Sequence, residues 1–401
     1  MIPVADALAR ILDGLPPTGP ETVALPEAWG RVLAAPVAAR LTQPPAAVSA
    51  MDGYALRAAD AAVGTPLRVI GQAPAGHPFP GQVGPGEAVR IFTGGFVPPG
   101  ADAILLQEDA TAADGRVTAT EAPRAGRHIR RAGLDFAAGD TLLSPGRKLT
   151  ARDIGLAAAG NHPWVTVHRR PRVGILATGD EIALPGDPLP EGGIVSSNAH
   201  ALATLIRAGG GDSLVLPIAP DDRDAIAAIA GAAARCDLLV TTGGASVGDH
   251  DLVQAALGPE GFSLDFWKIA MRPGKPLIFG HLHGTPLLGL PGNPVSALVC
   301  AVLFLLPSLA RLSGAPAGPT PRRPALLGTD LPANDRREDY VRATLSADAS
   351  GALVATPFSL QDSSMLTVLA RADALLVRAP YAPAARAGEP VSVIELSTLG
   401  V

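Results

Sequence analysis

The central part of the chain alternates between short apolar runs and longer amphipathic segments. Apolar, β-branched runs at 173–177, 213–218 and 237–242 predict strands, and the spacing of apolar residues at 198–208 and 223–234 predicts helices. This alternation indicates a mostly parallel sheet with helices on both faces, which is a three-layer α/β domain. Such sheets bind ligands beyond the carboxyl ends of their strands, so the loops there are the first candidates for a functional site.

The segments before this domain have two other patterns. Residues 1–43 have mainly helical spacing, and 134–168 contain a helix expected to begin after Thr150 and to end at Gly160. We expect these two segments to pack together as one discontinuous, largely helical linking domain. Residues 44–133 between them carry short β-rich runs separated by Gly and Pro, which predicts a β-rich insertion domain.

The sequence therefore predicts a multidomain protein with both α+β and α/β parts. Residues 169–315 hold the expected α/β domain. A Pro- and Gly-rich linker follows, and short β-rich runs over 316–401 predict a small C-terminal β-barrel. A chain of 401 residues is long enough to build several separate cores.

Composition excludes several classes of protein. The formal net charge is −5 and no basic run occurs, which argues against a nucleic-acid partner. Cys236 and Cys300 form no Cys-x-x-Cys pair, so neither a zinc site nor a disulfide framework is predicted. The most apolar run, 297–306, stops at Pro307 and is shorter than the roughly 20 residues of a membrane span. Charges interrupt the N-terminal apolar residues, unlike a signal peptide, so we expect a cytoplasmic protein without membrane contact.

The stretch 238–251 has the most distinctive chemistry. Its apolar run changes at Gly243 into a loop whose glycines let backbone N–H groups approach an anion closely. Ser246 adds a hydroxyl donor, and the carboxylates of Asp249 and Asp251 are oxygen ligands of the kind that Mg²⁺ prefers. The stretch therefore predicts a phosphate-binding loop beside a divalent cation.

Carboxylates also follow the two neighbouring predicted strands. Glu181 ends the loop 178–181, and Asp221 and Asp222 follow the strand at 213–218. We expect both loops to open on the same edge of the sheet, with one of the two aspartates alternatively capping the next helix. In the insertion, Asp52-Gly53 predicts a turn that displays a carboxylate, for which a solvated turn is the simpler interpretation.

Lysine is rare in this arginine-rich chain. Only three lysines occur, and two of them, Lys268 and Lys275, lie close to Arg272. Lysine supplies a compact point charge, so this segment predicts contact with phosphate or another oxyanion, with chance clustering as the alternative.

Common nucleotide-binding motifs are missing. The pair Gly274-Lys275 lacks the earlier glycine of a Walker A loop, and no G-x-G-x-x-G stands at a strand-to-helix turn. The run 244–248 matches the nucleophile elbow G-x-S-x-G, with His281 or His283 as its base, so a serine hydrolase is an alternative. An elbow passes directly into a helix, however, whereas polar residues prolong the loop here.

Eight motifs together closely resemble the molybdopterin molybdenumtransferase family, which includes bacterial MoeA proteins and the E domain of gephyrin. They occur in the family's order and span most of the chain. They are SAMDGYA at 49–55, IFTGG at 91–95, GLD at 133–135, TGDE at 178–181, SSN at 196–198, GGASVGDHD at 243–251, RPGKP at 272–276 and LPGNPVSA at 290–297.

The resemblance implies an elongated homodimer of four-domain subunits with an active cleft shared between an α/β domain and the partner's β-rich insertion. It also implies insertion of molybdate into adenylylated molybdopterin with Mg²⁺-dependent release of AMP. Molybdopterin adenylyltransferase and the proteins that mature molybdoenzymes are the implied partners.

The site residues implied by the resemblance fall into three groups, which agree in part with the chemistry above. The implied catalytic residues are Asp52, Thr93, Asp135, Glu181, Asp221, Asp251, Lys268 and Lys275. The implied substrate-binding residues are Gly243, Gly244, Ser246, Gly248, Arg272, Pro291, Asn293, Pro294, Ser296, Arg337 and Ser363. The implied metal ligands are Asp221, Asp249 and Asp251.

Some positions depart from the family's pattern. Arg272 stands where lysine is expected, which keeps the charge but changes its shape, and Ser364 stands where glycine usually follows Ser363. The choice among Arg336, Arg337 and Arg342 as the ligand contact stays open.

Two further function classes are in view. Molybdopterin adenylyltransferase shares a related α/β domain and is the main alternative, but this chain surrounds that domain with three more. A scaffold role like that of gephyrin is the other, and no additional interaction segment is visible for it.

Overall fold

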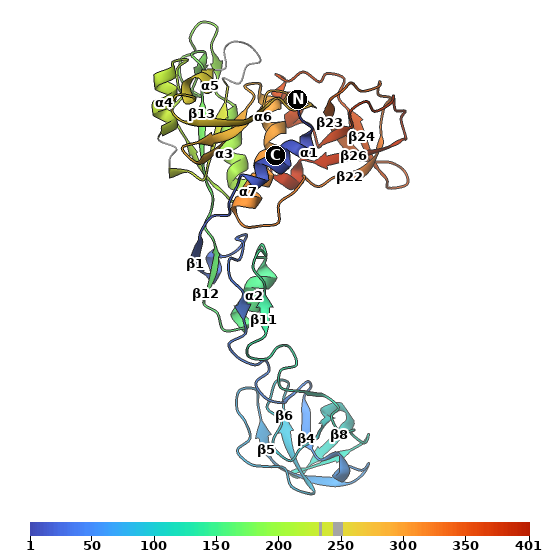
Figure 1. The fold of residues 1–401 in the computed structure, drawn as a ribbon. Helices are drawn as coiled ribbons and strands as arrows, with labels where there is room; N and C mark the ends of the chain where they lie inside the picture. The colour runs from blue at the N-terminus through green and yellow to red at the C-terminus, as the bar shows by residue number, and fades with distance from the viewer. Residues whose placement is uncertain (232–234, 244–251) are drawn as a thin grey trace.

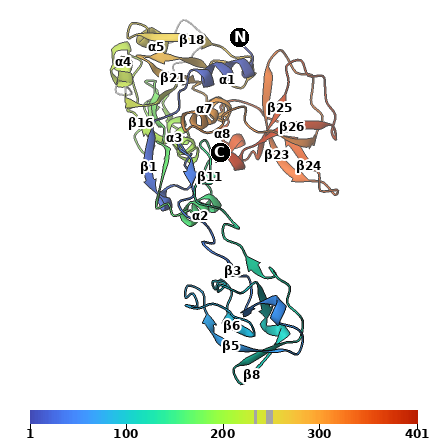
Figure 2. The ribbon, with the colours of Figure 1, turned by 60° about the horizontal axis from the view of Figure 1, so that its bottom comes forward.

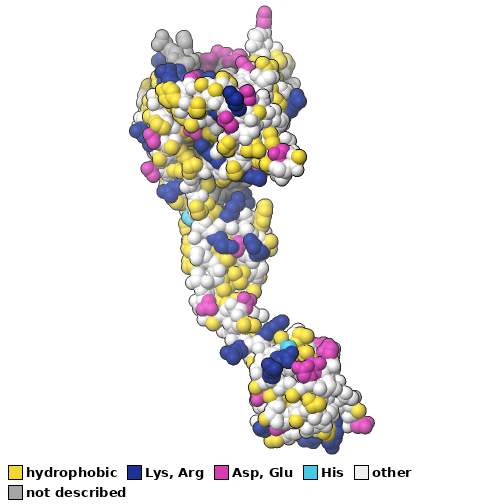
Figure 3. Space-filling view, turned by 90° about the vertical axis from the view of Figure 1, so that its right-hand side faces the viewer, with side chains coloured by type: hydrophobic (Ala, Val, Ile, Leu, Met, Phe, Trp, Pro, Cys, Tyr) yellow, Lys and Arg dark blue, Asp and Glu magenta, His cyan; other side chains and the backbone are white. Residues whose placement is uncertain are grey.

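The computed structural model describes residues 1–231, 235–243 and 252–401. The molecule is elongated, with an α/β domain and a C-terminal barrel side by side at one end and a β-rich insertion at the other (Figure 1). A narrow linking region joins the two ends (Figure 1, Figure 3). Both chain termini lie at the α/β end (Figure 1).

A six-stranded, mostly parallel sheet forms the centre of the α/β domain. Its strand order is β16-β13-β17-β21-β20-β18, in which the first four strands are parallel and the last two antiparallel. The strands are β13 (Arg172–Ala177), β16 (Asp212–Val215), β17 (Leu238–Thr242), β18 (Phe262–Trp267), β20 (Ile278–Leu282) and β21 (Thr285–Leu290).

Helices cover both faces of this sheet, as the sequence predicts. Side chains of β17 alternate between the two layers, since Val240 packs with α3 while Leu239 packs with α4 and α5. The helices are α3 (Asn198–Ala208), α4 (Arg223–Gly231), α5 (Leu252–Leu257), α6 (Pro294–Cys300) and α7 (Leu306–Leu312). The predicted strands and helices of this domain are confirmed, although β16 ends three residues early.

The apolar run 297–306 does not stop at Pro307 as predicted. Helix α6 continues through a π-helical segment, η5 (Ala301–Leu305), into α7. Proline lacks an N–H, so nearby carbonyls need other donors, and the Ser308 and Thr320 hydroxyls supply them to Phe304 and Val302 at 2.6 and 2.8 Å. By length and hydropathy this 19-residue helix is long enough to cross a membrane, but 78% of its apolar window is buried in the core.

Residues 1–43 divide between two cores instead of forming one helical segment. Helix α1 (Val4–Asp13) packs its apolar face into the α/β core beside α7 (Figure 2). Residues after it form strands, and β1 (Pro20–Ala24) pairs with β12 (Trp164–His168) over five residues. The expectation of helix beyond Asp13 was wrong, because residues 20–24 pair with β12 as a strand, with Val23 buried opposite Val165.

The linking region otherwise follows the prediction. Helix α2 (Ala151–Ala159) begins at a Thr150–Asp153 capping box and ends at Gly160. Its core joins residues 23–37 to residues 143–167, so the two predicted segments do pack together there. Its short strands are β2 (Val37–Ala38) and β11 (Thr141–Leu143), which pair with each other.

The insertion is an all-β unit, as predicted. Its six-stranded sheet has the order β7-β4-β6-β5-β9-β8. The elements are β3 (Val48–Ser49), β4 (Gly53–Leu56), β5 (Pro66–Ala73), β6 (Glu87–Ile91), β7 (Ala103–Leu106), η3 (Gln107–Asp109), β8 (Ala110–Ala113), β9 (Arg116–Ala119) and β10 (Ile129–Arg130).

The C-terminal strands close into the predicted barrel. The order β23-β24-β22-β26-β25 returns to β23 through a direct β23–β25 pairing, so these five strands form a ring. The elements are β22 (Arg323–Leu327), β23 (Glu338–Ala347), β24 (Leu353–Pro357), α8 (Leu366–Ala370), β25 (Ala374–Arg378) and β26 (Pro390–Glu395), and β19 (Met271–Arg272) of the α/β domain pairs with β23.

Candidate functional site

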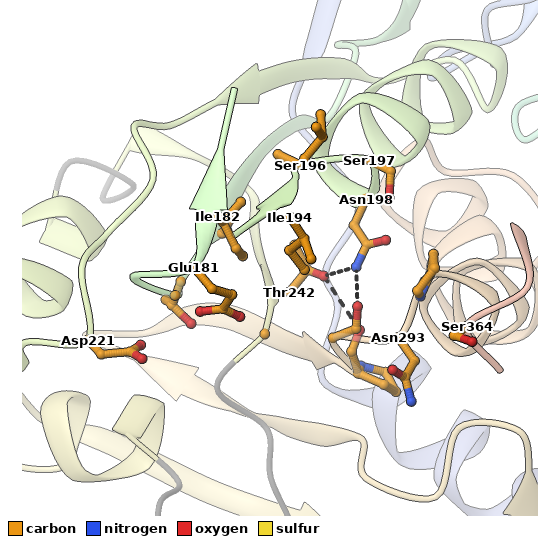
Figure 4. Close-up of a pocket in the computed structure, with 18 of the residues that line it drawn as sticks. Glu181, Ile182, Ile194, Ser196, Ser197, Asn198, Asp221, Thr242, Asn293 and Ser364 are labelled. Carbon is orange, nitrogen blue, oxygen red and sulfur yellow. Dashed lines mark hydrogen bonds between the residues drawn. The ribbon is translucent and has the colours of Figure 1, made fainter. Parts of the chain in front are cut away.

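A pocket of about 760 Å³ lies beyond the carboxyl ends of β13, β17 and β21 (Figure 4). Its polar lining comes from the loops that follow these strands, as the sequence predicts. An apolar wall of Ile182, Ile194 and Val195 belongs to the short strands β14 (Ile182–Ala183) and β15 (Ile194–Val195). The pocket is large enough for an extended organic ligand.

One asparagine joins three loops at the floor of the pocket. The Asn198 side-chain amide, at the start of α3, donates to the Thr242 hydroxyl at 2.9 Å and to the Gly292 carbonyl at 2.7 Å (Figure 4). The Thr242 hydroxyl in turn lies 3.5 Å from the Pro291 carbonyl. These bonds fix the ends of β17 and β21 relative to α3, so Asn198 shapes the pocket.

Acidic side chains gather on one side of the pocket. Glu181 and Asp221 line it together (Figure 4), and the Asp221 backbone N–H donates to the Asp180 carboxylate at 3.0 Å. Partial burial raises the pKa of Asp221, and the charges of Asp180 and Glu181 act in the same direction. Asp222 caps α4 by accepting from the Ala225 N–H at 2.9 Å, which confirms the capping role expected for one of the pair.

The described residues do not complete a metal site. Within 1–231, 235–243 and 252–401, no group of three or more His, Cys, Asp or Glu side chains is placed to hold a metal ion. The predicted ligands Asp249 and Asp251 lie outside these ranges, as do Gly244, Ser246 and Gly248. Glu181 and Asp221 are thus the carboxylates that the described part of the pocket offers to a cation.

The opposite side of the pocket suits an anion. Asn293 and Pro294 stand at the start of α6, where the helix dipole favours negative charge. The Asn293 amide donates to the Ser363 hydroxyl at 3.0 Å, and the Val295 N–H donates to the Ser363 carbonyl at 3.2 Å. The barrel therefore contributes Ser363, and its neighbour Ser364 lines the pocket (Figure 4).

A second cavity of about 180 Å³ lies where the α/β domain meets the barrel. Met1, Lys275, Asp335, Arg336 and Arg337 line it. The Arg337 guanidinium donates to Asp335 at 2.8 Å, and this bond lowers the pKa of Asp335 to about 2. The cavity brings three cationic side chains together with one carboxylate.

Two of the predicted cationic side chains, Arg272 and Lys268, contact other side chains of the protein. Arg272 makes a forked contact with Asp339 of β23, in which its Nε donates at 2.9 Å, and this pairing raises the pKa of Arg272. The Lys268 ammonium lies 3.9 Å from the centre of the Trp267 ring. Neither side chain lines the larger pocket, whereas Lys275 lines the smaller cavity.

Three other predicted residues belong to the far end of the molecule. The Asp52 carboxylate accepts from the backbone N–H and the hydroxyl of Thr93, at 2.7 and 2.8 Å. The Thr93 N–H lowers the pKa of Asp52 most, and the hydroxyl and the charge of Arg90 add to this. Asp135 is exposed at the neck of the insertion, where its N–H donates to the Gln43 carbonyl.

The pocket thus contains part of the predicted set. Its lining includes Glu181, Asp221, Gly243, Pro291, Asn293 and Pro294. Ser296 is buried in α6, and the lysines and arginines lie elsewhere. Sequence reasoning did not select Thr178, Asn198 or the apolar wall, although Asn198 stands in the quoted SSN motif and carried that signal.

Arg342 is the third arginine that the sequence left open. Its side chain is 1% exposed and donates from Nη2 to the Asp362 carbonyl at 3.2 Å, beneath the loop that carries Ser363. Arg336 and Arg337 line the small cavity instead, so the three arginines occupy different surroundings.

The two histidines of the serine hydrolase alternative lie away from the pocket. Strand β20 runs antiparallel to β21, and its Leu282 pairs with Thr285 at the start of that strand. His281 and His283 therefore lie toward the end of the sheet opposite the pocket, and Ser246 lies outside the described residues.

Comparison with known proteins gives one consistent result. Residues 2–160 match the MoeA N-terminal region (domain I and II), 174–311 a probable molybdopterin binding domain, and 324–396 the MoeA C-terminal region (domain IV). A molybdopterin molybdenumtransferase of Haemophilus influenzae is 34% identical over 397 residues, which cover 98% of each chain. The chain belongs to the MoeA family.

Other members of the MoeA family agree with this assignment. Molybdopterin molybdenumtransferase 2 of Mycobacterium tuberculosis is 39% identical over 82% of this chain and 84% of its own. The solved MoeA structure from Pyrococcus horikoshii matches with a TM-score of 0.86 at 29% identity, covering 98% of this chain and 99% of that one. The family resemblance and the multidomain fold expected from it are confirmed.

Proposed function

We propose that this protein is a molybdopterin molybdenumtransferase, which inserts molybdate into adenylylated molybdopterin and releases AMP. Support comes from the names of relatives that align over nearly the whole chain and from the family's regions in the same order. The observation that carries the proposal is the pocket, which offers carboxylates on one side and an anion-favouring helix start on the other. A ligand with a phosphoanhydride needs both.

The chain's own groups would act mainly by positioning. The start of α6, with Asn293 and Ser363, would hold a phosphate, and Asn198 would keep the strand ends at the correct separation. Lys275, with Arg336 and Arg337, would hold the molybdate oxyanion at the domain junction. The apolar wall would exclude water from the flat part of the ligand.

We also propose that the acidic side takes a Mg²⁺ ion. The fit is supported by Glu181 and Asp221, which line the pocket and supply hard oxygen ligands, and by Asp180, whose carboxylate accepts from the Asp221 N–H beside them. Asp249 and Asp251 are the other proposed contributors. Bound there, Mg²⁺ would neutralise charge on the phosphoanhydride.

A homodimer is the proposed assembly. Asp52 and Thr93 belong to the insertion, which the linking region separates from the α/β pocket of the same chain (Figure 1). A partner's insertion would bring that carboxylate to the pocket. Trp29 and Trp164 of the linking region, 70% and 58% exposed, supply apolar surface of the kind that subunit interfaces cover.

The remaining parts of the proposal follow from the family. We propose the domain limits 1–43 with 134–168, 44–133, 169–315 and 316–401, a cytoplasmic location, and action after molybdopterin adenylyltransferase and before the proteins that mature molybdoenzymes. The adenylyltransferase alternative is not favoured, because the matched regions extend well beyond the α/β domain.

The test is direct. Purified protein incubated with adenylylated molybdopterin and Mg²⁺ should release AMP only when molybdate is added. Release without molybdate, or no release at all, would contradict the proposal. For the shared cleft, Asp52→Ala and Asp251→Ala subunits are mixed: heterodimers should regain about half the sites of one dimer, as only one cleft is then intact, whereas clefts within single subunits would give no recovery.

A further inference from the structure

Arg90 in the insertion domain has its guanidinium next to two aromatic rings. Its Cζ lies 5.0 Å from the centre of the Tyr54 ring and 5.1 Å from that of the Phe92 ring. Tyr54 is the direct cross-strand partner of Arg90 in the β4–β6 pairing, and Phe92 follows two residues later on the same face. These cation–π contacts favour the observed position of the guanidinium.

From this position the guanidinium reaches Gly53, which follows Asp52, and Gln107, which lies across from Asp52. Its Nη1 donates to the Gly53 carbonyl at 3.3 Å, and its Nη2 donates to the side-chain oxygen of Gln107 at 2.7 Å. The backbone N–H of Gln107 donates in turn to the Asp52 carbonyl at 3.2 Å. Arg90 therefore fixes the backbone both after Asp52 and across from it.

The backbone at Gly53 has no freedom to compensate if Arg90 is lost. A Cβ at Gly53 would lie 2.0 Å from the Leu105 carbonyl oxygen, so strands β4 and β7 touch here. Asp52 precedes this contact and directs its Oδ1 at the N–H and hydroxyl of Thr93. Both bonds end on Oδ1, so within the described residues Oδ2 stays available to a ligand.

We propose that Arg90 is the positioning residue for Asp52, holding that carboxylate in the geometry that the reaction needs. The inference rests on the proposed function, in which Asp52 completes a partner's cleft. Arginine suits the task better than lysine, because its rigid fork donates to two separate acceptors while its planar group lies next to aromatic rings, whereas an ammonium is a compact point charge. Arg90 itself does not contact the reacting atoms.

A purely structural role would give a different result, so the test needs a local readout. The full-length variants Arg90→Lys and Arg90→Met are compared with the matched control Arg68→Met, which removes an exposed arginine paired with Glu87 on the same sheet. Selective carboxyl-¹³C labelling of aspartate, assigned with Asp52→Asn, reports the titration of Asp52, and the Thr93 amide proton reports its hydrogen bond. Both are measured without substrate.

Gln107, which accepts from Arg90, also donates from its amide to the Glu108 carboxylate at 3.3 Å. In Arg90→Met we expect the Asp52 pKa to rise, because a cation is lost, and the Thr93 amide signal to move upfield. In Arg90→Lys the pKa should stay near that of the wild type, while the amide signal moves as in Arg90→Met. An unchanged Thr93 signal in both variants would overturn the proposal.

The second part of the test measures kcat and KM of the same variants. Both Arg90 variants should lose at least about tenfold in kcat, since misplacing a catalytic group by a fraction of an ångström has effects of this size, while KM for the adenylylated pterin changes by less than about twofold. Arg68→Met should match the wild type in both. If the wild-type protein releases no AMP, the proposed function fails and the spectroscopic arm alone decides the role of Arg90. Wild-type kcat in Arg90→Lys would overturn it.

Discussion

Replacing Gly243 with alanine should disrupt the pocket where β17 ends. The backbone φ of Gly243 is +92°, and an L-residue in left-handed backbone costs about 1–2 kcal/mol. A Cβ there would also lie 2.6 Å from the Thr178 carbonyl oxygen, whereas real Cβ atoms keep at least 3.0 Å, so the ends of β13 and β17 must separate by about 0.4 Å. We expect a total cost of about 2–3 kcal/mol.

Gly292 provides a matched control on the neighbouring loop of the same pocket. A Cβ at Gly292 would meet the Gly243 Cα at 3.5 Å, which is an ordinary contact, and its φ is not positive. We expect Gly292→Ala to change stability by less than about 0.5 kcal/mol. The two variants differ by the same single methyl group, so a difference between them reports backbone geometry and not the loss of glycine as such.

Thermal unfolding and AMP release measure the two effects. For a domain of this size about 1 kcal/mol corresponds to about 2–4 °C in Tm, so the α/β transition of Gly243→Ala should fall by about 4–12 °C and its turnover should drop sharply. Gly292→Ala should keep the wild-type Tm. Equal Tm values and equal turnover for the two variants would refute the argument that the Gly243 conformation holds the strand ends in place.

Three more predictions test single contacts. Asn198→Ala removes both amide bonds to Thr242 and Gly292, so it should cost about 1–3 kcal/mol and weaken AMP binding, which calorimetry measures; unchanged affinity would contradict the role of Asn198. Thr320→Val removes the donor to the Val302 carbonyl and should lower Tm by a few degrees, about 1 kcal/mol, without altering turnover. The raised folded-state pKa of Asp221 means that its ionisation destabilises the fold as pH rises through that pKa. Asp221→Asn should therefore gain up to about 0.5 kcal/mol at pH 7 after solvent screening, lose this gain below the unfolded pKa of aspartate, and lose activity; equal stability at all pH values would contradict it.

The part of the larger pocket that lies at the ends of the parallel strands was predictable from the sequence. Local patterns identify β13 and β17, and a parallel sheet necessarily brings the loops after them to one edge, which is why Glu181, Asp221 and Gly243 meet. The barrel was also predictable, because short β-rich runs indicate an all-β domain.

The contacts that the sequence did not predict involve partners that are distant along the chain. Arg272 was expected to hold an oxyanion, and the sequence did not predict that its guanidinium also pairs with Asp339, 67 residues later. Likewise, helix α6 passes Pro307 because Thr320, beyond the end of the helix, supplies one of the donors that the interrupted ladder needs. Neither partner has a local signal that links it to the residue it contacts.

The proposed shared cleft places a demand on the linking region. A carboxylate carried at the far end of one subunit must reach the partner's pocket within about 0.5 Å to be effective, so the arm that carries it has to be stiff. The junction with the α/β domain meets this demand: the Arg169 guanidinium holds Asp237 with two bonds of 2.9 and 2.7 Å, and His168 Nδ1 lies 2.7 Å from the Thr18 carbonyl. Because these contacts fix both strands of the β1–β12 ribbon where they leave the α/β domain, the direction of the arm is set by the same core that builds the pocket.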